Sequence, residues 1–416
     1  MKNTEYNGYE AIFRKEDKKR TVLIPWFTDF LSPIIPAVAQ LAGYTFVNCP
    51  KTSKVSADIG LKYGNNEICY PATLVLGDLI AEIQTGKYRI ENLAVAITQT
   101  GGQCRATNYI SLIKSGLKNA GYGQIPVISV STGDVHNNEQ PGFRLPFHKI
   151  LYPTLYGFLF GDALGQLLNS YKVREQNSGE SEQLFTKYMN DAEQIILKKR
   201  PKQLLNLLEC AVADFNKIEI YEDKDFKKIG LIGEIFVKYN HFGQAHLTEW
   251  LQKQNFEVVV PSMCQFFMQT FINSKVNSQN GISRKGILSK ISMPLVYHFL
   301  NKKMGEFDFI LRKSRFYAPY ENIYELAETA KDVLDLSNQF GEGWLIAGEV
   351  ANFAKKDITR VVCVQPFGCI ANHVVAKGIE TRLKKLYPKM NLLFLDIDGG
   401  IAEVNLQNRL KFLLVD

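Results

Sequence analysis

Three of the seven cysteines in the chain share a position that suits a metal centre. Cys69, Cys104 and Cys369 each stand directly before a stretch whose apolar spacing predicts a helix, and strand-like runs precede Cys104 and Cys369. The positive end of a helix dipole lowers the pKa of a thiol and stabilises negative charge nearby. An iron–sulfur cluster held by thiolates is anionic, so a shared site of this kind fits such a cluster.

Two other interpretations of these cysteines remain open. A lone buried cysteine is commonly an inert packing residue. Structural zinc commonly takes four ligands that include paired CxxC motifs, and the chain contains no CxxC. A set of three thiolates leaves one iron of a cubane open for a substrate or a bridging ligand, which is typical of a catalytic cluster. Gly101, Gly102 and Gly368 would let backbone N–H groups approach the cluster closely.

Two further cysteines are weaker candidates for metal binding. Cys363 lies in a predicted strand six residues before Cys369. If it binds metal, it would be a ligand of a second cluster. Cys49 follows another predicted strand and is a candidate for a fourth ligand. For both residues the alternative is a thiol that packs in the core, and this alternative is favoured.

Three polar residues beside these motifs are candidates for catalytic roles. His373 follows Cys369 by one helical turn and could transfer a proton or donate to a substrate carbonyl. Arg105 adjoins Cys104 and could balance cluster charge or hold a thioester or phosphate. Glu342 is a candidate polar residue of the site itself. Surface, capping or ion-paired roles are equal alternatives for His373 and Arg105.

The pattern of elements predicts an α/β protein with two Rossmann-like parallel-sheet domains and helical insertions. Nearly continuous apolar runs, typical of buried parallel strands, occur at 21–25, 44–47, 93–97, 125–130, 228–234, 256–261, 360–365 and 392–396. Residues 1–150 are expected to form the first α/β domain and residues 151–225 a helical connector. Residues 226–416 are expected to form the second α/β domain, with a helical insertion at 263–350.

The bulk composition limits the class of protein. The 416 residues are 46% hydrophobic and 22% charged, with a formal net charge of +7. These values are ordinary for a globular protein of two or three domains. The sequence shows no apolar run long enough to span a bilayer, no signal-peptide pattern and no dense basic clusters with interleaved aromatics. We therefore expect a cytoplasmic protein that binds neither membranes nor nucleic acid.

Long segments around the three cysteines resemble one family of enzymes. They are NNEICYPATLVLGDLI, QTGGQCRATNYISLIKSGLKNAGYGQIPVISVS, GEGWLIAGE, VVCVQPFGCIANHVVAKGIETRLKKLYP and LDIDGGIAEVNLQNRLKFLL. They are similar to the C-terminal part of CoA-substrate-specific enzyme activases. That part is itself similar to the cluster-binding subunits of 2-hydroxyacyl-CoA dehydratases and to double-cubane cluster proteins. The resemblance covers nearly the whole chain from about residue 20.

The resemblance implies an iron–sulfur enzyme component of anaerobic metabolism. Its cofactor would be a [4Fe-4S] cluster or a double-cubane cluster, held by Cys69, Cys104 and Cys369. Low-potential electrons would come from an ATP-dependent activator protein. They would serve radical dehydration of a hydroxyacyl-CoA or reduction of a small molecule, that is, lyase or oxidoreductase chemistry. Relatives pair two similar subunits, so a homo- or heterodimer is expected.

Some features of the sequence depart from the pattern of this family, and the function of the chain has one alternative. The chain lacks the phosphate-binding loop of the activator's own ATPase domains, so the activator would be a separate polypeptide. Gln103 stands where the family pattern has glycine, and Ala371 and Gly399 stand where it has proline. The alternative function is that of a non-catalytic, cluster-binding or regulatory partner protein.

Overall fold

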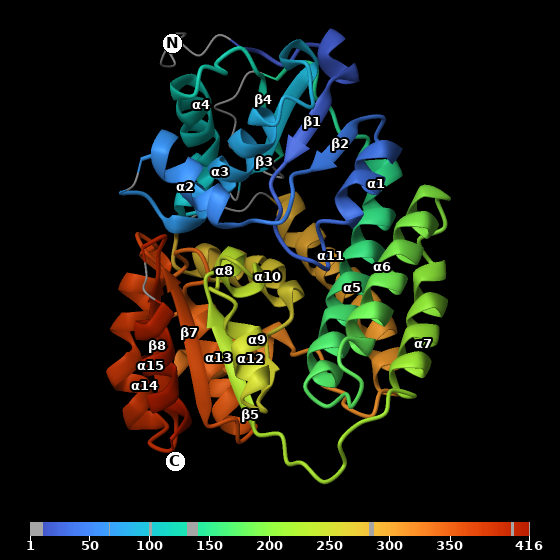
Figure 1. The fold of residues 1–416 in the computed structure, drawn as a ribbon. Coiled ribbons are helices and arrows are strands. Elements are labelled where there is room, and N and C mark those ends of the chain that lie inside the picture. The colour runs from blue at the N-terminus through green and yellow to red at the C-terminus, as the bar shows by residue number, and fades with distance from the viewer. Residues whose placement is uncertain are drawn as a thin grey trace.

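Two wholly parallel, four-stranded sheets organise the chain, one in each half (Figure 1). The computed structural model describes residues 11–65, 67–99, 102–130, 140–282, 287–400 and 403–415. Helices surround both sheets, which is the arrangement that parallel strands require because their crossover connections lie on the faces of the sheet. The predicted class, an α/β protein with two Rossmann-like domains, is confirmed.

The first sheet contains β1 (Thr21–Ile24), β2 (Thr45–Asn48), β3 (Leu93–Thr98) and β4 (Val127–Val130), in the order β2-β1-β3-β4. Its helices are α1 (Ile34–Leu41), α2 (Lys54–Tyr63), α3 (Tyr70–Gln84) and α4 (Tyr109–Asn119). Alternate residues of β1 enter different cores: Val22 packs with Ala39 of α1, and Leu23 packs with Leu76 of α3. Burial on both faces explains why these strands are continuous apolar runs.

The second sheet contains β5 (Lys228–Gly233), β6 (Glu257–Val259), β7 (Arg360–Pro366) and β8 (Asn391–Ile397), in the order β6-β5-β7-β8. Counted along the chain, this order is the same as that of the first sheet. The two halves therefore repeat one topology, although the sequence shows no clear internal repeat. In each sheet the order reverses between the first and third strands, which is where open α/β sheets build ligand sites at their carboxyl ends.

The connector helices lie side by side next to both halves, and the other helices surround the second sheet (Figure 1). The connector consists of α5 (Phe147–Lys172), α6 (Glu180–Leu197) and α7 (Gln203–Phe215). The remaining helices are α8 (Ile235–Tyr239), α9 (Leu247–Lys253), α10 (Met263–Gln279), α11 (Ile287–Leu311), α12 (Ile323–Lys331), α13 (Trp344–Lys355), α14 (Glu380–Leu386) and α15 (Glu403–Leu414). No helix in the described part of the chain has both the length and the apolar character needed to cross a membrane.

The carboxyl ends of the two sheets face each other. The backbone N–H of Tyr70, at the start of α3, donates to the carbonyl of Phe367, just after β7, over 3.0 Å. The rings of Phe27, which follows β1, and Phe236, which follows β5, stack with centroids 5.7 Å apart. The segments that follow strands in both halves therefore meet at one internal boundary.

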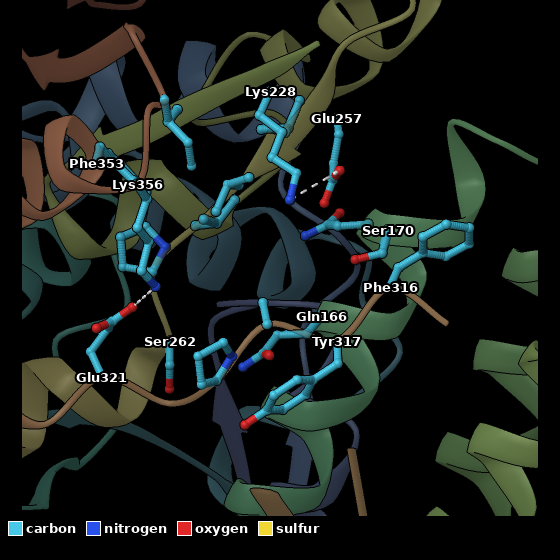
Figure 2. Close-up of a pocket in the computed structure, with 18 of the residues that line it drawn as sticks. Gln166, Ser170, Lys228, Glu257, Ser262, Phe316, Tyr317, Glu321, Phe353 and Lys356 are labelled. Atoms are coloured by element: carbon cyan, nitrogen blue, oxygen red, sulfur yellow. Dashed lines mark hydrogen bonds and ion pairs between the residues drawn. The ribbon is translucent and has the colours of Figure 1, made fainter. Parts of the chain in front are cut away.

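A cavity of about 280 Å³ lies elsewhere, between the connector helix α5 and the second sheet (Figure 2). Lys228 and Glu257, the first residues of β5 and β6, are on its wall. Val259, Val260 and Ser262, at and just beyond the end of β6, line it too, so the cavity runs along the whole edge strand.

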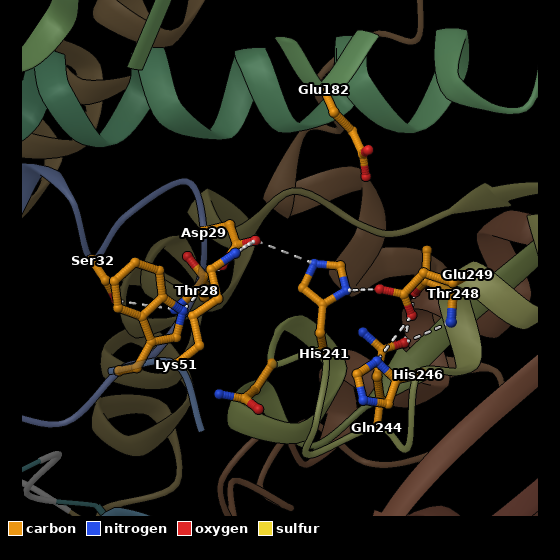
Figure 3. Close-up of polar contacts among 12 residues, drawn as sticks. Thr28, Asp29, Ser32, Lys51, Glu182, His241, Gln244, His246, Thr248 and Glu249 are labelled. Carbon is orange, nitrogen blue, oxygen red and sulfur yellow. Dashed lines mark hydrogen bonds and ion pairs between the residues drawn. The ribbon is translucent and has the colours of Figure 1, made fainter. Parts of the chain in front are cut away.

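A polar cluster joins the two halves at their boundary (Figure 3). His241 Nδ1 lies 2.7 Å from Glu249 Oε1, and His241 Nε2 lies 3.8 Å from Asp29 Oδ2 of the first half. Lys51 Nζ lies 2.6 Å from the same Asp29 oxygen. Burial opposes protonation of His241, but the hydrogen bond and charge of Glu249, with the charge of Asp29, outweigh it and raise its pKa. His246 also faces Glu249, with Nδ1 3.5 Å from Oε2.

We expect His241→Gln to remove a pH-dependent part of the stability. A raised folded-state pKa stabilises the protein fully below the unfolded value of about 6.5, and the contribution is lost as pH rises through the folded pKa. Since the side chain of His241 is 38% exposed, the effect should be about 1 kcal/mol or less. Urea midpoints measured on both sides of that window should differ less in the variant than in the wild type. His298→Gln, at an exposed position, is the control; an unchanged pH dependence in His241→Gln would contradict the assignment.

Candidate metal centre

Cys69 and Cys369 are brought together by a close approach of two loops. Cys69 is the N-cap residue of α3, and Cys369 follows β7 directly before the helical segment that begins at Ile370. Gly368 has a φ of +73°, and a Cβ at this position would lie 3.1 Å from the backbone N of Cys69. The left-handed backbone favours glycine here, and this contact leaves little room for a side chain. The two cysteine loops therefore touch through their main chains.

Tyr109 links Cys69 to the third cysteine. Its hydroxyl lies 3.0 Å from Cys69 Sγ. Burial raises the pKa of Tyr109, and the charges of Cys69 and Cys104 raise it further. Cys104 caps the short 3₁₀ turn Arg105–Asn108 that precedes α4, and its Sγ accepts a hydrogen bond from the N–H of Ala106 over 3.5 Å. The three cysteines that the sequence singled out therefore lie in one region, where the charge of Cys69 adds to the effect of burial in raising the pKa of Cys104.

All three thiols are held in their neutral form by their surroundings. Burial is the largest cause that raises the pKa of Cys69 to about 11 and that of Cys104 to about 12. Burial also raises the pKa of Cys369. The helix starts do not offset this cost, contrary to what the dipole argument alone suggests. A cationic centre would have to supply the compensation, and its binding would release the thiol protons.

Two carboxyl groups lie beside the thiols. Glu234 directly follows β5 and caps α8, where its Oε2 accepts from the N–H of Val237 over 2.8 Å. Glu342 is 4% exposed, and its Oε1 accepts from the N–H of Ile235 over 2.8 Å. Negative charge on either glutamate raises the pKa of Cys104 and of Cys369.

Burial raises the pKa of both carboxyl groups. It is the largest cause of the rise for Glu234, to about 8, and Glu342 adds to that rise. Burial likewise raises the pKa of Glu342. Near neutral pH Glu234 can therefore carry a proton beside the thiols. The sequence predicted Glu342 but not Glu234, whose signal was its place at the carboxyl end of a buried strand.

A buried ion pair supplies positive charge behind the site. Lys238 Nζ lies 3.4 Å from Glu349 Oε1, and each side chain is 3% exposed. The charge of Lys238 lowers the pKa of Glu234 and of Glu342, against the effect of burial. Sequence reasoning did not find this pair, because its members come from α8 and α13, far apart in the chain.

Asn372 connects Cys369 to Cys363. Its Nδ2 donates to Cys369 Sγ over 3.1 Å, and its Oδ1 lies 3.8 Å from Cys363 Sγ. Gln365 Nε2 donates to the Asn372 carbonyl over 2.9 Å and fixes the start of the π-helical turn Ala371–Ala376. Such turns are frequently found at functional sites. Cys363 is therefore placed behind Asn372 in the interior of the second half, where it is 2% exposed.

The remaining predicted residues occupy different surroundings. Arg105 Nη1 donates to the Glu67 carbonyl over 3.2 Å, and its charge lowers the pKa of Cys69, so it belongs to the group. The side chain of His373 is 38% exposed and faces Asp396, with Nδ1 3.8 Å from Oδ1.

Cys49 and one predicted glycine do not join the thiol group. Cys49 is 1% exposed in the first half, where burial raises its pKa and the charges of Asp78 and Glu82 raise it further. The structure does not place Cys49 beside the three cysteines. Gly101 lies outside the described residues.

The chemistry of this donor set suits a cluster better than a single ion. Three thiols, two of them buried, lie in one region with a phenol and amide N–H groups that contact them, and sulfur ligands with hydrogen bonds to sulfur are the usual environment of iron–sulfur centres. Within the described ranges, no group of three His, Cys, Asp or Glu side chains has the arrangement that holds one metal ion.

The site stands at the reversal points of both sheets. Cys104 follows β3, Glu234 follows β5 and Cys369 follows β7. These are the carboxyl ends at which ligands bind in such folds.

In comparisons with known proteins, no family model matches the chain and no curated protein matches it.

Proposed function

We propose that the chain is an iron–sulfur redox enzyme component of the 2-hydroxyacyl-CoA dehydratase type. Cys69, Cys104 and Cys369 would hold a [4Fe-4S] or double-cubane cluster. A separate ATP-dependent activator would deliver low-potential electrons to it, for radical dehydration or reduction of an acyl-CoA or another small molecule. The observation that carries the proposal is that three thiols from three separate loops, two of them buried, lie together where the carboxyl ends of the two sheets face each other.

The surrounding groups would tune this centre. When bound, a cluster of this type supplies one-electron chemistry at a potential set by hydrogen bonds and charge around its sulfurs. Asn372 donates to Cys369, and Tyr109 is within hydrogen-bond distance of Cys69. Partners of this kind orient ligands and commonly contribute 10–100-fold to metal affinity, that is, about 1.4–2.7 kcal/mol.

Glu234 and Glu342 would hold protons next to the site. An anionic centre repels carboxylates, so both glutamates would remain neutral more readily when it is bound. Charged Lys238 and Arg105 supply the opposite sign from α8 and from the Cys104 loop. The chain's own residues could therefore store a proton within reach of a substrate and limit the build-up of negative charge.

Exposed apolar side chains near Cys369 offer a surface for a partner. Phe367, Ile370 and Val374 are 50%, 38% and 64% exposed. Apolar groups gathered on a surface commonly mark a protein contact. We place the activator contact here, and we propose a cytoplasmic protein that works as a homo- or heterodimer.

Cluster retention should depend on pH. The thiols of Cys69 and Cys104 have raised pKa values, so each must lose a proton to bind. Retention should weaken as pH falls, by up to ~10-fold per pH unit for each thiol that must lose its proton. Iron per chain after anaerobic gel filtration at a series of pH values measures this. Retention that is constant with pH, or that improves on acidification, would speak against thiolate ligation.

The function itself is tested by electron delivery. The anaerobically purified chain is mixed with an ATP-dependent electron donor of the activator class, and cluster absorbance is followed with and without MgATP. The proposal predicts bleaching that requires ATP, followed by turnover when a hydroxyacyl-CoA is added. A cluster that is reduced without any turnover of acyl-CoA or small-molecule substrates would instead identify a non-catalytic partner protein. A cluster that the donor never reduces would contradict the proposal.

A further inference from the structure

The cavity between α5 and the second sheet has the features of a separate small-molecule site. Its volume is about 280 Å³, close to the lower end of the usual range for ligand pockets. Its walls come from α5, from β6 and the segment that follows it, from the segment after α11, and from α13 (Figure 2). It runs along the edge strand β6, whereas Cys104 and Cys369 follow the inner strands β3 and β7.

The edge strand β6 presents backbone groups on this side. β6 is the last strand of the sheet and pairs only with β5 among the described strands. The N–H of Glu257 donates to the Lys227 carbonyl over 3.0 Å, so the N–H and C=O of the next residue, Val258, point away from β5. Val258 lines the cavity. It therefore offers a donor and an acceptor side by side.

Carboxamide side chains surround the same space. Gln166 and Asn169 come from α5, Gln265 from α10 and Asn352 from α13. Gln265 is 2% exposed, and its Oε1 has no hydrogen-bond partner among the described residues. A buried carbonyl oxygen without a partner costs free energy unless a ligand or a water donates to it. Gln265 thus has a buried acceptor next to this cavity that lacks a partner in the described part of the chain.

Aromatic rings provide flat apolar walls. The Arg174 guanidinium lies 4.2 Å from the ring centre of Phe316 and covers one of its faces. The Tyr317 hydroxyl donates to Asp308 over 2.8 Å, which fixes that ring. Phe353 is buried and packs against Gly230 of β5. All three aromatic residues line the cavity, and their positions are set before any ligand arrives.

The cavity also carries one surplus positive charge. Arg174 Nη2 lies 2.6 Å from Glu257 Oε2 and already neutralises that carboxylate. Lys228 Nζ lies 3.9 Å from the same oxygen, so its charge is not needed there. Lys356, by contrast, is paired with Glu321. Glu349, which also lines the cavity, is paired with Lys238. Figure 2 shows Lys228 on the same wall as Glu257.

We propose that this cavity binds an adenine nucleotide with a single phosphate. A carboxamide reads the donor and acceptor of adenine together, and aromatic side chains stack on the flat base. The base would lie among Phe316, Tyr317 and Phe353. Its polar edge would meet the carboxamides and the free edge of β6, and the phosphate would meet Lys228. The site does not depend on the proposed cluster.

The test is calorimetric titration of the full chain with adenosine 5′-monophosphate (AMP), adenosine and uridine 5′-monophosphate. AMP should bind at one site per chain, and the uridine nucleotide at least ~10-fold more weakly, because each bidentate base contact contributes that much discrimination or more. Asn352→Leu should weaken AMP and adenosine alike by ~10-fold or more. Lys228→Met should weaken AMP and leave adenosine unchanged. Gln194→Leu, an exposed amide on α6, should change nothing.

The results for the wild type and the variants decide whether the cavity binds the nucleotide. Thermal unfolding checks that the variants are folded, and Gln166→Leu replaces Asn352→Leu if that variant is not. AMP that shows no saturable binding to the wild type overturns the proposal. Binding that the cavity variants leave unchanged, or equal binding of the two nucleotides, overturns it as well. Iron content is measured in parallel, so failure of this site is distinguished from failure of the cluster proposal.

Discussion

Replacing Lys238 with methionine is expected to lower the free energy of unfolding by about 3–5 kcal/mol. Lys238 and Glu349 are each 3% exposed, with 3.4 Å between their charged groups. Removing the lysine leaves the carboxylate of Glu349 buried without its partner, which is the costly way to break such a pair. Equilibrium urea unfolding, followed by tryptophan fluorescence, measures the loss.

The double variant Lys238→Met, Glu349→Leu is the matched control. Removing both charges should restore most of the lost stability, because well-packed apolar side chains often replace a buried pair at no net cost. Lys217→Met removes one side of an exposed pair and should change stability by about 1 kcal/mol or less. If Lys238→Met lowered the free energy of unfolding no more than Lys217→Met does, the buried pair of Lys238 and Glu349 would not stabilise the fold as described.

Replacing Gly368 with alanine is expected to weaken cluster retention by ~10-fold or more. The new Cβ would lie 3.1 Å from the backbone of Ile68 and Cys69, and alanine at a φ of +73° is strained. The loops would have to move apart by a few tenths of an ångström, and the strained backbone should distort the Cys369 loop. Iron per chain after anaerobic purification measures the effect.

Gly378→Ala is the control for that variant. Gly378 follows the same cysteine loop, but a Cβ there meets nothing within 4 Å, so iron content should stay at the wild-type level. Thermal unfolding of both variants separates a local effect from general destabilisation. Full retention of iron in Gly368→Ala would show that the contact between the loops is not needed.

The sheets were predictable from the sequence because parallel strands are buried on both faces. A strand buried on both faces is a continuous apolar run, without alternating polar residues. The run at 93–97 was predicted to be a strand on this basis, and the structure has β3 at Leu93–Thr98. The shared strand order of the two sheets was not predictable, since it depends on which strands pair rather than on the pattern within each strand.

The site was predictable only in part, because much of it comes from contacts between distant segments. Cys69, Cys104 and Cys369 were found from local context, namely helix starts and strand ends. Glu234 was missed, because its place beside the thiols depends on how β5 faces the first sheet. His373 was expected one regular turn beyond Cys369. In the π-helical turn it is Asn372 that contacts the Cys369 sulfur, and His373 faces Asp396.

The most direct test of a thiolate-held cluster is the visible spectrum and iron content of protein purified without oxygen. The wild type should show a broad band near ~400 nm and about four or more irons per chain. Cys104→Ser should lose most of both, whereas Cys210→Ser, at an exposed cysteine, should keep them. A colourless wild-type protein without iron, even after anaerobic reconstitution with iron and sulfide, would contradict the account.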